Sequence, residues 1–345
     1  MVFLSEILQH GVQKMGAGIA LILNSFLIYL IMKKSPKELG VYRYLMIFIS
    51  VLEIMFAVVD VLVSPIIHNV GLIFLLITRL DSSWFDPTIQ LTLTGFYCAL
   101  YGSCMALFGI HFIYRYLVIK GDRVLETFHS WKILVWFSVP VIFGIVWGTV
   151  AVVFCGPRDS TNRIIENELS ENLGLEMDDV VYVAIDSFDD NKGIYWPALI
   201  GLMVDFMIIG SSFFTVIYFG ALLHKELQKY IANNKNLSVK NKLLQTQLYY
   251  SLVIQTLIPI IFLQVPVSSL FIMSFCSLNL GEFSGLVSMT IGVYPAIDPL
   301  PTMFIVTSYR NAIRDFVKKA ARKFGCASNV TIPTVQIGSV ETTKL

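Results

Sequence analysis

The chain has 345 residues, of which 56% are hydrophobic and only 14% are charged, and its formal net charge is +1. A composition this apolar excludes an ordinary soluble domain and is typical of a membrane protein. The small net charge hides an uneven distribution of Lys and Arg along the chain, so it says little about partners.

Seven apolar stretches follow one another, each long enough to cross a hydrocarbon core of ~30 Å at ~1.5 Å per residue. Their predicted ranges are Val12–Met32, Tyr42–Val63, Leu91–Ile119, Trp131–Phe154, Trp196–Leu223, Gln247–Met273 and Phe283–Thr307. The pattern predicts an all-α membrane protein, a bundle of seven transmembrane helices over residues 12–307. Residues 1–11 precede it as a short extracellular N-terminus. The first stretch is too long for a signal-peptide core and is followed, not preceded, by Lys33 and Lys34, so we expect it to remain as a helix.

Most of the 25 Lys and Arg residues lie in the loops after spans one, three and five and in the tail 308–345. Basic loops stay in the cytoplasm, so the predicted orientation is N-terminus outside and C-terminus inside.

The predicted outer loop between spans four and five, Cys155–Tyr195, is long and rich in Asp and Glu. Its part Ser160–Leu173 has the spacing of apolar residues expected of a helix. Two interpretations stay open. The loop is either a solvated acidic flap that helps to keep the orientation, or a lid over a ligand entrance that favours cationic or neutral solutes over anions.

In the cytoplasmic tail, residues 309–324 have one apolar face and one basic face. This predicts an amphipathic helix on the anionic inner leaflet, with membrane lipids as partners. Cys326 follows the helix and is either a palmitoylation site or an unmodified thiol.

Four carboxyl groups lie inside the predicted spans, where an ionisable group is costly to bury: Glu53, Asp60, Asp205 and Asp298. For Asp60 and Asp298 the sequence favours a polar switch network that differs between resting and active states. For Glu53 and Asp205 it does not separate that role from structural hydrogen bonding between helices. Pro299 and the neighbouring prolines predict a kinked, locally unwound segment around Asp298, whose freed carbonyls need partners from other helices or water.

Six side chains in the outer halves of the spans are candidate ligand contacts: Tyr97, Tyr101, Met105, Trp196, Gln264 and Ser268. A mainly apolar cavity with a few hydroxyl and amide groups suits a small, mostly neutral ligand. The alternative is that these side chains only pack the helices together. A disulfide between Cys98 and Cys155 is conceivable, although cysteines in membrane helices are usually small buried hydrophobes.

No catalytic or metal-binding motif is visible: there is no HExxH, no CxxC pair, no GxSxG and no phosphate-binding glycine loop. We therefore expect no enzyme, no cofactor, no metal and no nucleic-acid partner. The predicted seventh span contains no lysine, which excludes a retinal Schiff base.

Four strings, in order, resemble the nematode serpentine chemoreceptors of the Str type, the group to which the diacetyl odorant receptor belongs. They are SPKELGVYRYLM at Ser35–Met46, HFIYRY at His111–Tyr116, QTQLYYSLVIQTLIP at Gln245–Pro259 and YPAIDPLP at Tyr294–Pro301, with Tyr309-Arg310 beyond. The resemblance runs from the first span to the tail helix. It implies a G-protein-coupled receptor in the ciliary plasma membrane of sensory neurons, which binds an odorant or metabolite between the outer halves of its helices and activates a Gα subunit.

By position, the segment from His111 to Arg115 resembles the acidic-Arg-Tyr switch of rhodopsin-like receptors, but it has no adjacent acid, so the usual ionic lock is not expected. The pair Asp298-Pro299 likewise resembles the Asn-Pro switch of their seventh span. His111 is thus a candidate switch residue together with Asp60, Asp298 and Pro299. The candidate G-protein contacts are Arg115, Tyr116 and Lys242. For Arg115 the alternative is a basic residue at the membrane edge.

Three other functions are alternatives to a chemoreceptor: a transporter, a ligand-gated channel and a peptide receptor. A transporter should show internal repeats and half-helices at the midplane, and no repeat is visible. A ligand-gated channel of the insect odorant-receptor kind has the opposite orientation. A peptide receptor with the same fold fits less well with the short outer N-terminus and the apolar upper helices. The oligomeric state, monomer or homo- or hetero-oligomer, stays open.

Overall fold

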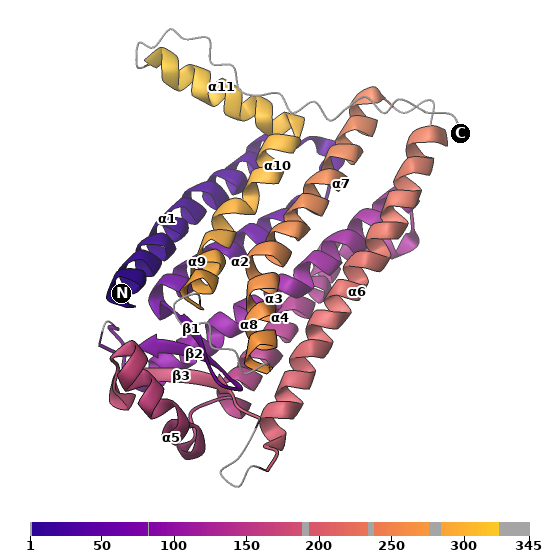
Figure 1. Cartoon of the computed structure of the whole chain (residues 1–345). Coiled ribbons are helices and arrows are strands. Elements are labelled where there is room, and N and C mark those ends of the chain that lie inside the picture. The colour runs from indigo at the N-terminus through magenta and orange to yellow at the C-terminus, as the bar shows by residue number, and fades with distance from the viewer. Residues whose placement is uncertain (1, 82, 188–192, 234–237, 276–283, 324–345) are drawn as a thin grey trace.

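The computed structural model describes residues 2–81, 83–187, 193–233, 238–275 and 284–323, and these form a helical bundle with a small sheet at one end (Figure 1). The long helices are α1 (Val2–Lys34), α2 (Tyr42–Val63), α3 (Pro87–Lys120), α4 (Ile133–Thr149), α6 (Trp196–Asn233), α7 (Val239–Pro259), α8 (Val265–Phe275), α9 (Ser284–Ile297), α10 (Pro299–Ile305) and α11 (Thr307–Lys323). Short turns η1 (Lys37–Leu39), η2 (Arg123–Phe128) and η3 (Ser130–Lys132) lie in the loops, and π-helical turns η4 (Val150–Phe154) and η7 (Ile260–Gln264) extend α4 and α7.

Six helical segments of the described chain are long and apolar enough to cross a membrane, and a bent pair brings the number to as many as seven. That pair consists of Gly285–Ile305, which is α9 with α10, and Thr307–Arg322, which turns away from it by 98°. The predicted bundle is therefore present, with α9 and α10 in the place of the predicted seventh span and α11 bent away after it.

Several helices run past the predicted span limits. Helix α1 begins at Val2 instead of Val12, α6 ends at Asn233 instead of Leu223, and α7 begins at Val239 instead of Gln247. Hydropathy locates the part of a helix that lies in lipid, whereas polar residues such as Lys225 and Lys229 continue the same backbone beyond it.

A belt of exposed apolar side chains surrounds the middle of the bundle. On α4 and α6 it includes Leu134, Ile142, Ile145, Met207, Phe214 and Ile217, each of which is more than half exposed. A soluble protein rarely exposes so much contiguous apolar surface, so this belt is the surface that faces the hydrocarbon core.

Helices α3 and α4 approach each other closely along two glycines of α4, Gly144 and Gly148, which are four residues apart. A Cβ atom at Gly144 would lie 2.6 Å from the carbonyl oxygen of Ala99, and one at Gly148 would lie 2.7 Å from that of Gly95. Small residues at this spacing let two membrane helices pack backbone against backbone.

We expect Gly144→Ala to lower the free energy of unfolding by about 1–3 kcal/mol, the usual range for overpacking a tight contact. The measurement is the thermal unfolding of the detergent-purified protein. Gly210→Ala is the matched control, because a Cβ atom there meets nothing within 4 Å. Equal melting temperatures for the two variants would contradict the close α3–α4 contact.

A three-stranded antiparallel sheet covers one end of the bundle, which the sequence analysis did not predict. Its strands are β1 (Ile66–Val70), β2 (Ile73–Arg79) and β3 (Val180–Ile185), in the order β1-β2-β3. The register pairs Val70 with Ile73 and Phe74 with Ile185. The first two strands follow α2, and the third belongs to the long outer loop, so the sheet joins two distant parts of the chain.

The helix α5 (Asp159–Glu168) and the turns η5 (Leu169–Leu173) and η6 (Met177–Asp179) complete this end, which we call the cap, residues 64–81, 83–86 and 155–187. One face of the sheet packs on α5 through a small core of its own that includes Leu75, Ile77, Ile165 and Tyr182. The alternate residues of the strands point to the bundle. The acidic loop is therefore a folded layer over the helices, which fits the lid interpretation better than a solvated flap.

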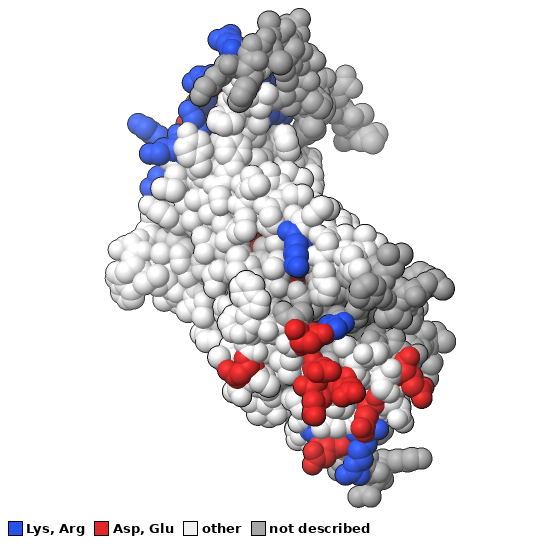
Figure 2. Space-filling model, turned by 90° about the vertical axis from the view of Figure 1, so that its left-hand side faces the viewer, with Lys and Arg blue, Asp and Glu red and all other residues white. Residues whose placement is uncertain are grey.

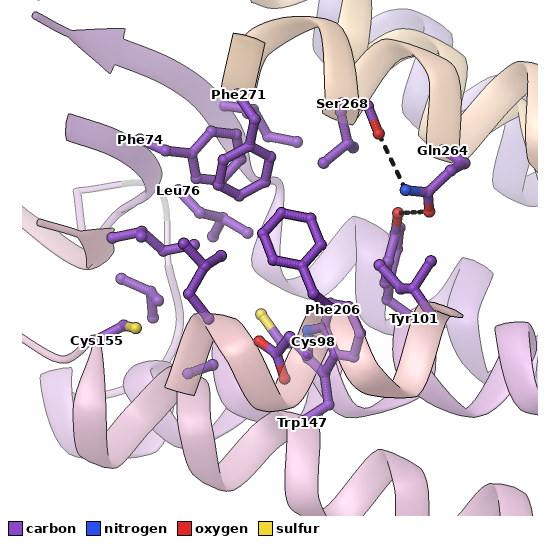
Figure 3. Close-up of a pocket in the computed structure, with 18 of the residues that line it drawn as sticks. Phe74, Leu76, Cys98, Tyr101, Trp147, Cys155, Phe206, Gln264, Ser268 and Phe271 are labelled. Atoms are coloured by element: carbon purple, nitrogen blue, oxygen red, sulfur yellow. Dashed lines mark hydrogen bonds between the residues drawn. The ribbon is translucent and has the colours of Figure 1, made fainter. Parts of the chain in front are cut away.

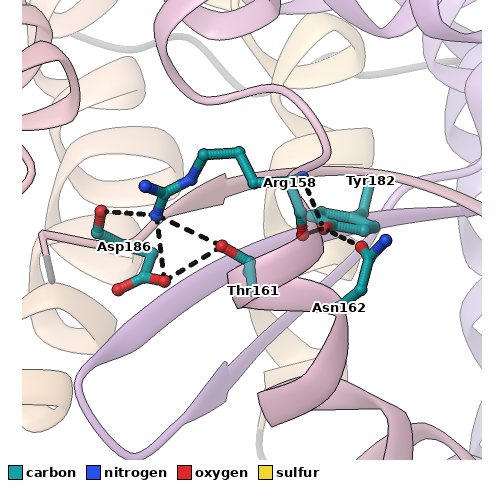
Figure 4. Close-up of polar contacts among 5 residues, drawn as sticks. All are labelled: Arg158, Thr161, Asn162, Tyr182 and Asp186. Carbon is teal, nitrogen blue, oxygen red and sulfur yellow. Dashed lines mark hydrogen bonds and ion pairs between the residues drawn. The ribbon is translucent and has the colours of Figure 1, made fainter. Parts of the chain in front are cut away.

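A buried ion pair ties α5 to β3 (Figure 4). Arg158 lies 3.0 Å from Asp186, which also accepts a 3.0 Å hydrogen bond from the Thr161 hydroxyl. The backbone N–H of Arg158 donates to the Tyr182 hydroxyl at 3.2 Å, and that hydroxyl donates to Asn162. Burial raises the pKa of Tyr182, so its hydroxyl stays protonated as the donor that this contact needs.

Removing the guanidinium takes away the ion-pair partner that lies 3.0 Å from the Asp186 carboxylate, which is 2% exposed. We expect Arg158→Ala to destabilise the cap by about 3 kcal/mol, since breaking one side of a buried pair is costly. The readout is the protease resistance of the cap in the purified protein. Exposed Glu166 on the same helix supplies the control, Glu166→Ala. Unchanged resistance in Arg158→Ala would rule out this role.

At the opposite end of the bundle, α11 turns away from α10, and its first turn is fixed by a 2.7 Å hydrogen bond between Tyr309 and Ser35. Charge follows the same division. Figure 2 shows Lys and Arg gathered toward the α11 end and most of the visible Asp and Glu over the cap. Cys326 lies outside the described residues.

Candidate functional site

A cavity of about 320 Å³ lies between the cap and the helices. Helices α3, α4, α6 and α8, turn η7 and all three strands contribute to it, and its lining is mostly hydrocarbon and aromatic (Figure 3). Its size falls at the lower end of the ~300–1,000 Å³ typical of small-molecule pockets, so it suits a small organic compound.

The sheet forms the roof of this cavity. Ile67, Phe74, Leu76, Val183 and Ile185, the strand residues opposite the cap core, all line it. The Phe74 ring stacks on Phe271 of α8, with the ring centroids 4.4 Å apart and the planes 9° from parallel. The roof thus rests directly on the helix that follows η7.

Three polar side chains form a hydrogen-bonded chain across one wall. The Tyr101 hydroxyl donates to Gln264 Oε1 at 3.1 Å, and Gln264 Nε2 donates to Ser268 Oγ at 3.0 Å (Figure 3). Gln264 ends the π-helical turn that follows Pro259, a residue that cannot donate the normal helical hydrogen bond. This chain connects α3 to η7 and α8.

Of the predicted ligand contacts, Tyr97, Tyr101, Gln264 and Ser268 line the cavity. Met105 lies deeper, beside a much smaller cavity, and Trp196 is 60% exposed and does not line either one. Four further aromatic residues line the cavity and were not among the predicted contacts: Phe74, Trp147, Phe206 and Phe271. The apolar run Ile73–Arg79 and the β-branched run Ile66–Val70, separated by two residues, were the signal for the roof.

Cys98 and Cys155 both line the cavity, and both thiols are free. The conceivable disulfide is therefore absent from this structure. Cys98 faces the cavity from within α3, and Cys155 lies at the end of η4. Within the described residues, no group of three or more His, Cys, Asp or Glu could hold a metal ion.

Below the cavity, three of the carboxyl groups lie in the closed centre of the bundle. Glu53, Asp60 and Asp298 are each at most 1% exposed. Glu53 adjoins Asp298, and Asp60 adjoins Tyr97, which itself lines the cavity.

Helix α9 ends at Ile297 and α10 starts at Pro299, so the regular helix is interrupted at Asp298. Asp298 itself keeps helical backbone angles (φ −57°, ψ −37°), and its N–H donates to the Tyr294 carbonyl at 3.2 Å, so the local unwinding predicted here is wrong for this residue. Two carbonyls beside this interruption have side-chain partners on other helices. Asn24 of α1 donates to the Pro295 carbonyl at 2.9 Å, and Gln255 of α7 donates to that of Asp298 at 3.2 Å.

Gln255 belongs to a row of polar residues on α7 in which Gln247, Ser251 and Gln255 are spaced four apart. No role was predicted for this row. Ser251 and Gln255 both hydrogen bond to Thr302 at 2.9 Å, and Gln247 donates to Thr307 at 2.6 Å. Hydrogen bonds of this kind hold membrane helices together, here α7 to α10 and the start of α11.

The end of α3 that lies away from the cap is tied to two neighbours. Arg115 is 2% exposed, donates a hydrogen bond to Gln245 of α7, and lies over the Tyr42 ring at 5.2 Å. His111 Nδ1 is 3.3 Å from the Tyr42 hydroxyl on α2. An amide and a tyrosine thus take the places where an ionic lock would need a carboxylate. We call Tyr42, His111, Arg115 and Gln245 the α3 lock.

The two other candidate G-protein contacts lie nearby and are partly buried. Tyr116 packs edge-on against Phe219 of α6, and Lys242 donates to the Ile231 carbonyl at 2.9 Å. Both therefore lie where the ends of α3, α6 and α7 that are farthest from the cap meet. Arg115 is covered in this structure, so a partner can reach it only if these helix ends separate.

Comparison with known proteins identifies the family and the fold of this chain. The family described as "Serpentine type 7TM GPCR chemoreceptor Str" matches residues 9–314. The chain is 32% identical to the Caenorhabditis elegans protein "G-protein coupled receptor str-217", over 90% of each chain. It is 29% identical to "Serpentine receptor class r-10" of the same organism, over 83% of this chain and 84% of that one. The structure of squid rhodopsin matches with a TM-score of 0.56 at 12% identity, covering 95% of this chain and 93% of that one, which shows a shared fold.

Proposed function

Because the chain belongs to the Str family of serpentine seven-transmembrane chemoreceptors, we propose that it binds a small chemical in the cavity under the cap and activates a Gα subunit at the other end of the bundle. The observation that carries the proposal is the placement of the cavity. The sheet forms its roof, and its wall includes side chains of the continuous helical segment from α7 to α8, which also carries Gln245 of the α3 lock.

A ligand in the cavity contacts Gln264, Ser268 and Phe271, which lie on η7 and α8. A change in this wall is transmitted along the helix to α7, because the segment from Val239 to Phe275 is continuous. At the far end of α7, Gln245 accepts the hydrogen bond from Arg115. A ligand that favours a different tilt of α7 therefore favours the open α3 lock, which is a shift between two existing states.

Opening the lock frees Arg115 between α3, α6 and α7. A charged guanidinium in a newly opened groove suits the carboxy-terminal helix of a Gα subunit, with Tyr116 and Lys242 at the rim. The carboxylate-rich cap and the basic α11 end support an orientation with the cap outside and α11 on the cytoplasmic leaflet. A plasma-membrane location in sensory cilia is the setting that the family suggests.

The test is a screen of odorants and small metabolites on cells that express the chain, with cyclic-nucleotide or calcium signalling as readout. We expect at least one compound to evoke a signal that Arg115→Ala removes at equal surface expression. Lys132→Ala is the control for a basic residue at the same end, because Lys132 is exposed. A signal that survives Arg115→Ala would contradict coupling through the α3 lock.

A further inference from the structure

The ligand cavity contains one carboxyl group, Asp205 of α6. Its side chain lines the cavity, it is 8% exposed, and its Oδ1 has no hydrogen-bond partner among the described residues. No Lys, Arg or His is present among the described residues that line the cavity. The carboxyl group is thus buried in a mainly hydrocarbon setting, and the described part of the chain places no cationic side chain in the cavity with it.

Burying such a group costs free energy, and a partner with a positive charge or a strong hydrogen-bond donor reduces that cost. Leu202, Phe206 and Ile209, its neighbours on α6, line the same cavity and offer no donor. The nearby thiols of Cys98 and Cys155 are weak donors at best. A bound ligand can therefore supply the partner that the Asp205 carboxyl group lacks.

The rest of the lining suits the same kind of ligand. Aromatic rings from β2, α4, α6 and α8 surround the cavity, and ring faces attract organic cations as well as hydrocarbon. Outside, the cap exposes carboxylates that lower the potential for an approaching cation and repel an anion. The exposed carboxylates include those of Asp159, Glu166, Glu171, Glu176, Asp178 and Asp179.

We propose that the cavity is selective for small organic cations, in which an ammonium group binds the Asp205 carboxylate and a hydrocarbon group of about the size of one ring fills the aromatic part. This inference rests on the proposed function, and it names the chemical class of the ligand at that site. The Tyr101–Gln264–Ser268 chain then lies beside the ligand and senses its hydrocarbon body.

The experiment uses matched amines and alcohols, which differ in charge but hardly in shape: 2-phenylethylamine with 2-phenylethanol, cyclohexylmethylamine with cyclohexylmethanol, and hexylamine with hexanol. Binding to the purified full-length protein is followed by the rise in its unfolding temperature, which reports affinity because a ligand stabilises the folded state it binds. We expect at least one amine to bind about tenfold or more tightly than its alcohol, as a charge-assisted hydrogen bond predicts.

Asp205→Asn keeps the shape and removes the charge, and we expect it to abolish that difference within a pair. The control is Ser211→Ala on the same helix, where the hydroxyl bonds only to the carbonyl of Ile208. Equal binding of an amine and its alcohol, an effect of Asp205→Asn on both alike, or no binding by any amine would each overturn the inference. If alcohols or other neutral compounds bind and signal, the proposed function stands without it, whereas a failure of every compound in the wider screen counts against the proposed function itself.

Discussion

Replacing Gln245 with leucine should raise ligand-independent signalling about tenfold. The substitution removes the acceptor of the Arg115 hydrogen bond, while a side chain of similar size still fills the space on α7. A hydrogen bond to a charged group contributes about 1.5–3 kcal/mol, and ~1.4 kcal/mol is a factor of ten in an equilibrium. Because the bond exists only with the α3 lock closed, its loss shifts the population toward the open state.

The measurement is basal nucleotide exchange on Gα in membranes with equal amounts of receptor. Thr246→Val is the matched control, since Thr246 is adjacent on α7 and its hydroxyl bonds only to the carbonyl of Lys242 in its own helix. Basal exchange that stays at the wild-type level in Gln245→Leu would show that the α3 lock does not hold the resting state.

Filling the cavity with Cys98→Trp should abolish the response to any ligand, with a loss of apparent affinity of about a hundredfold or more. Cys98 lines the cavity from α3, and an indole there occupies space that the ligand needs. Cys98→Ala is the control, because it keeps the cavity open and removes only the thiol. Overpacking lowers stability by about 1–3 kcal/mol, so receptor amounts at the surface must be compared.

The double variant Cys98→Trp with Gln245→Leu separates binding from signalling. If the bulky residue blocks only the cavity, the double variant keeps the raised basal exchange of Gln245→Leu and ignores the ligand. A double variant that is silent although it reaches the surface would mean that the cavity wall takes part in coupling itself. A ligand response that persists in Cys98→Trp would place the binding site elsewhere.

The sequence predicted the bundle well because hydropathy reports what a helix faces over its whole length. The interruption of the helix beside Asp298 was also predictable, since proline removes a helical hydrogen bond wherever it occurs. The unwinding expected there was wrong, because Asp298 keeps helical backbone angles. The helix ends were not, because a helix such as α6 continues through Lys225 and Lys229 after it leaves the lipid. The cap sheet was missed because β2 and β3 are mainly apolar on both faces, so the alternation that marks a half-buried strand is absent.

The site was predictable only in part, and for a related reason. Tyr97 and Tyr101 stand out as polar aromatics in an apolar span, and both line the cavity. Helix α4 is apolar on every side, so nothing in its sequence distinguishes Trp147, which lines the cavity, from Ile142, which is 54% exposed toward lipid. Asp205 was noticed as costly, but its place in the cavity depends on the rotation of α6 about its axis, which hydropathy does not fix.

The most direct test of the central claim, that a chemical held under the cap drives a Gα subunit, is nucleotide exchange in a reconstituted system. Purified receptor in lipid vesicles is combined with purified G protein and with an activating compound from the cell screen. The account predicts that the compound accelerates exchange with wild-type receptor and fails to do so with Cys98→Trp. A compound that leaves exchange unchanged but opens a current across the same vesicles would contradict the receptor mechanism and identify a ligand-gated channel.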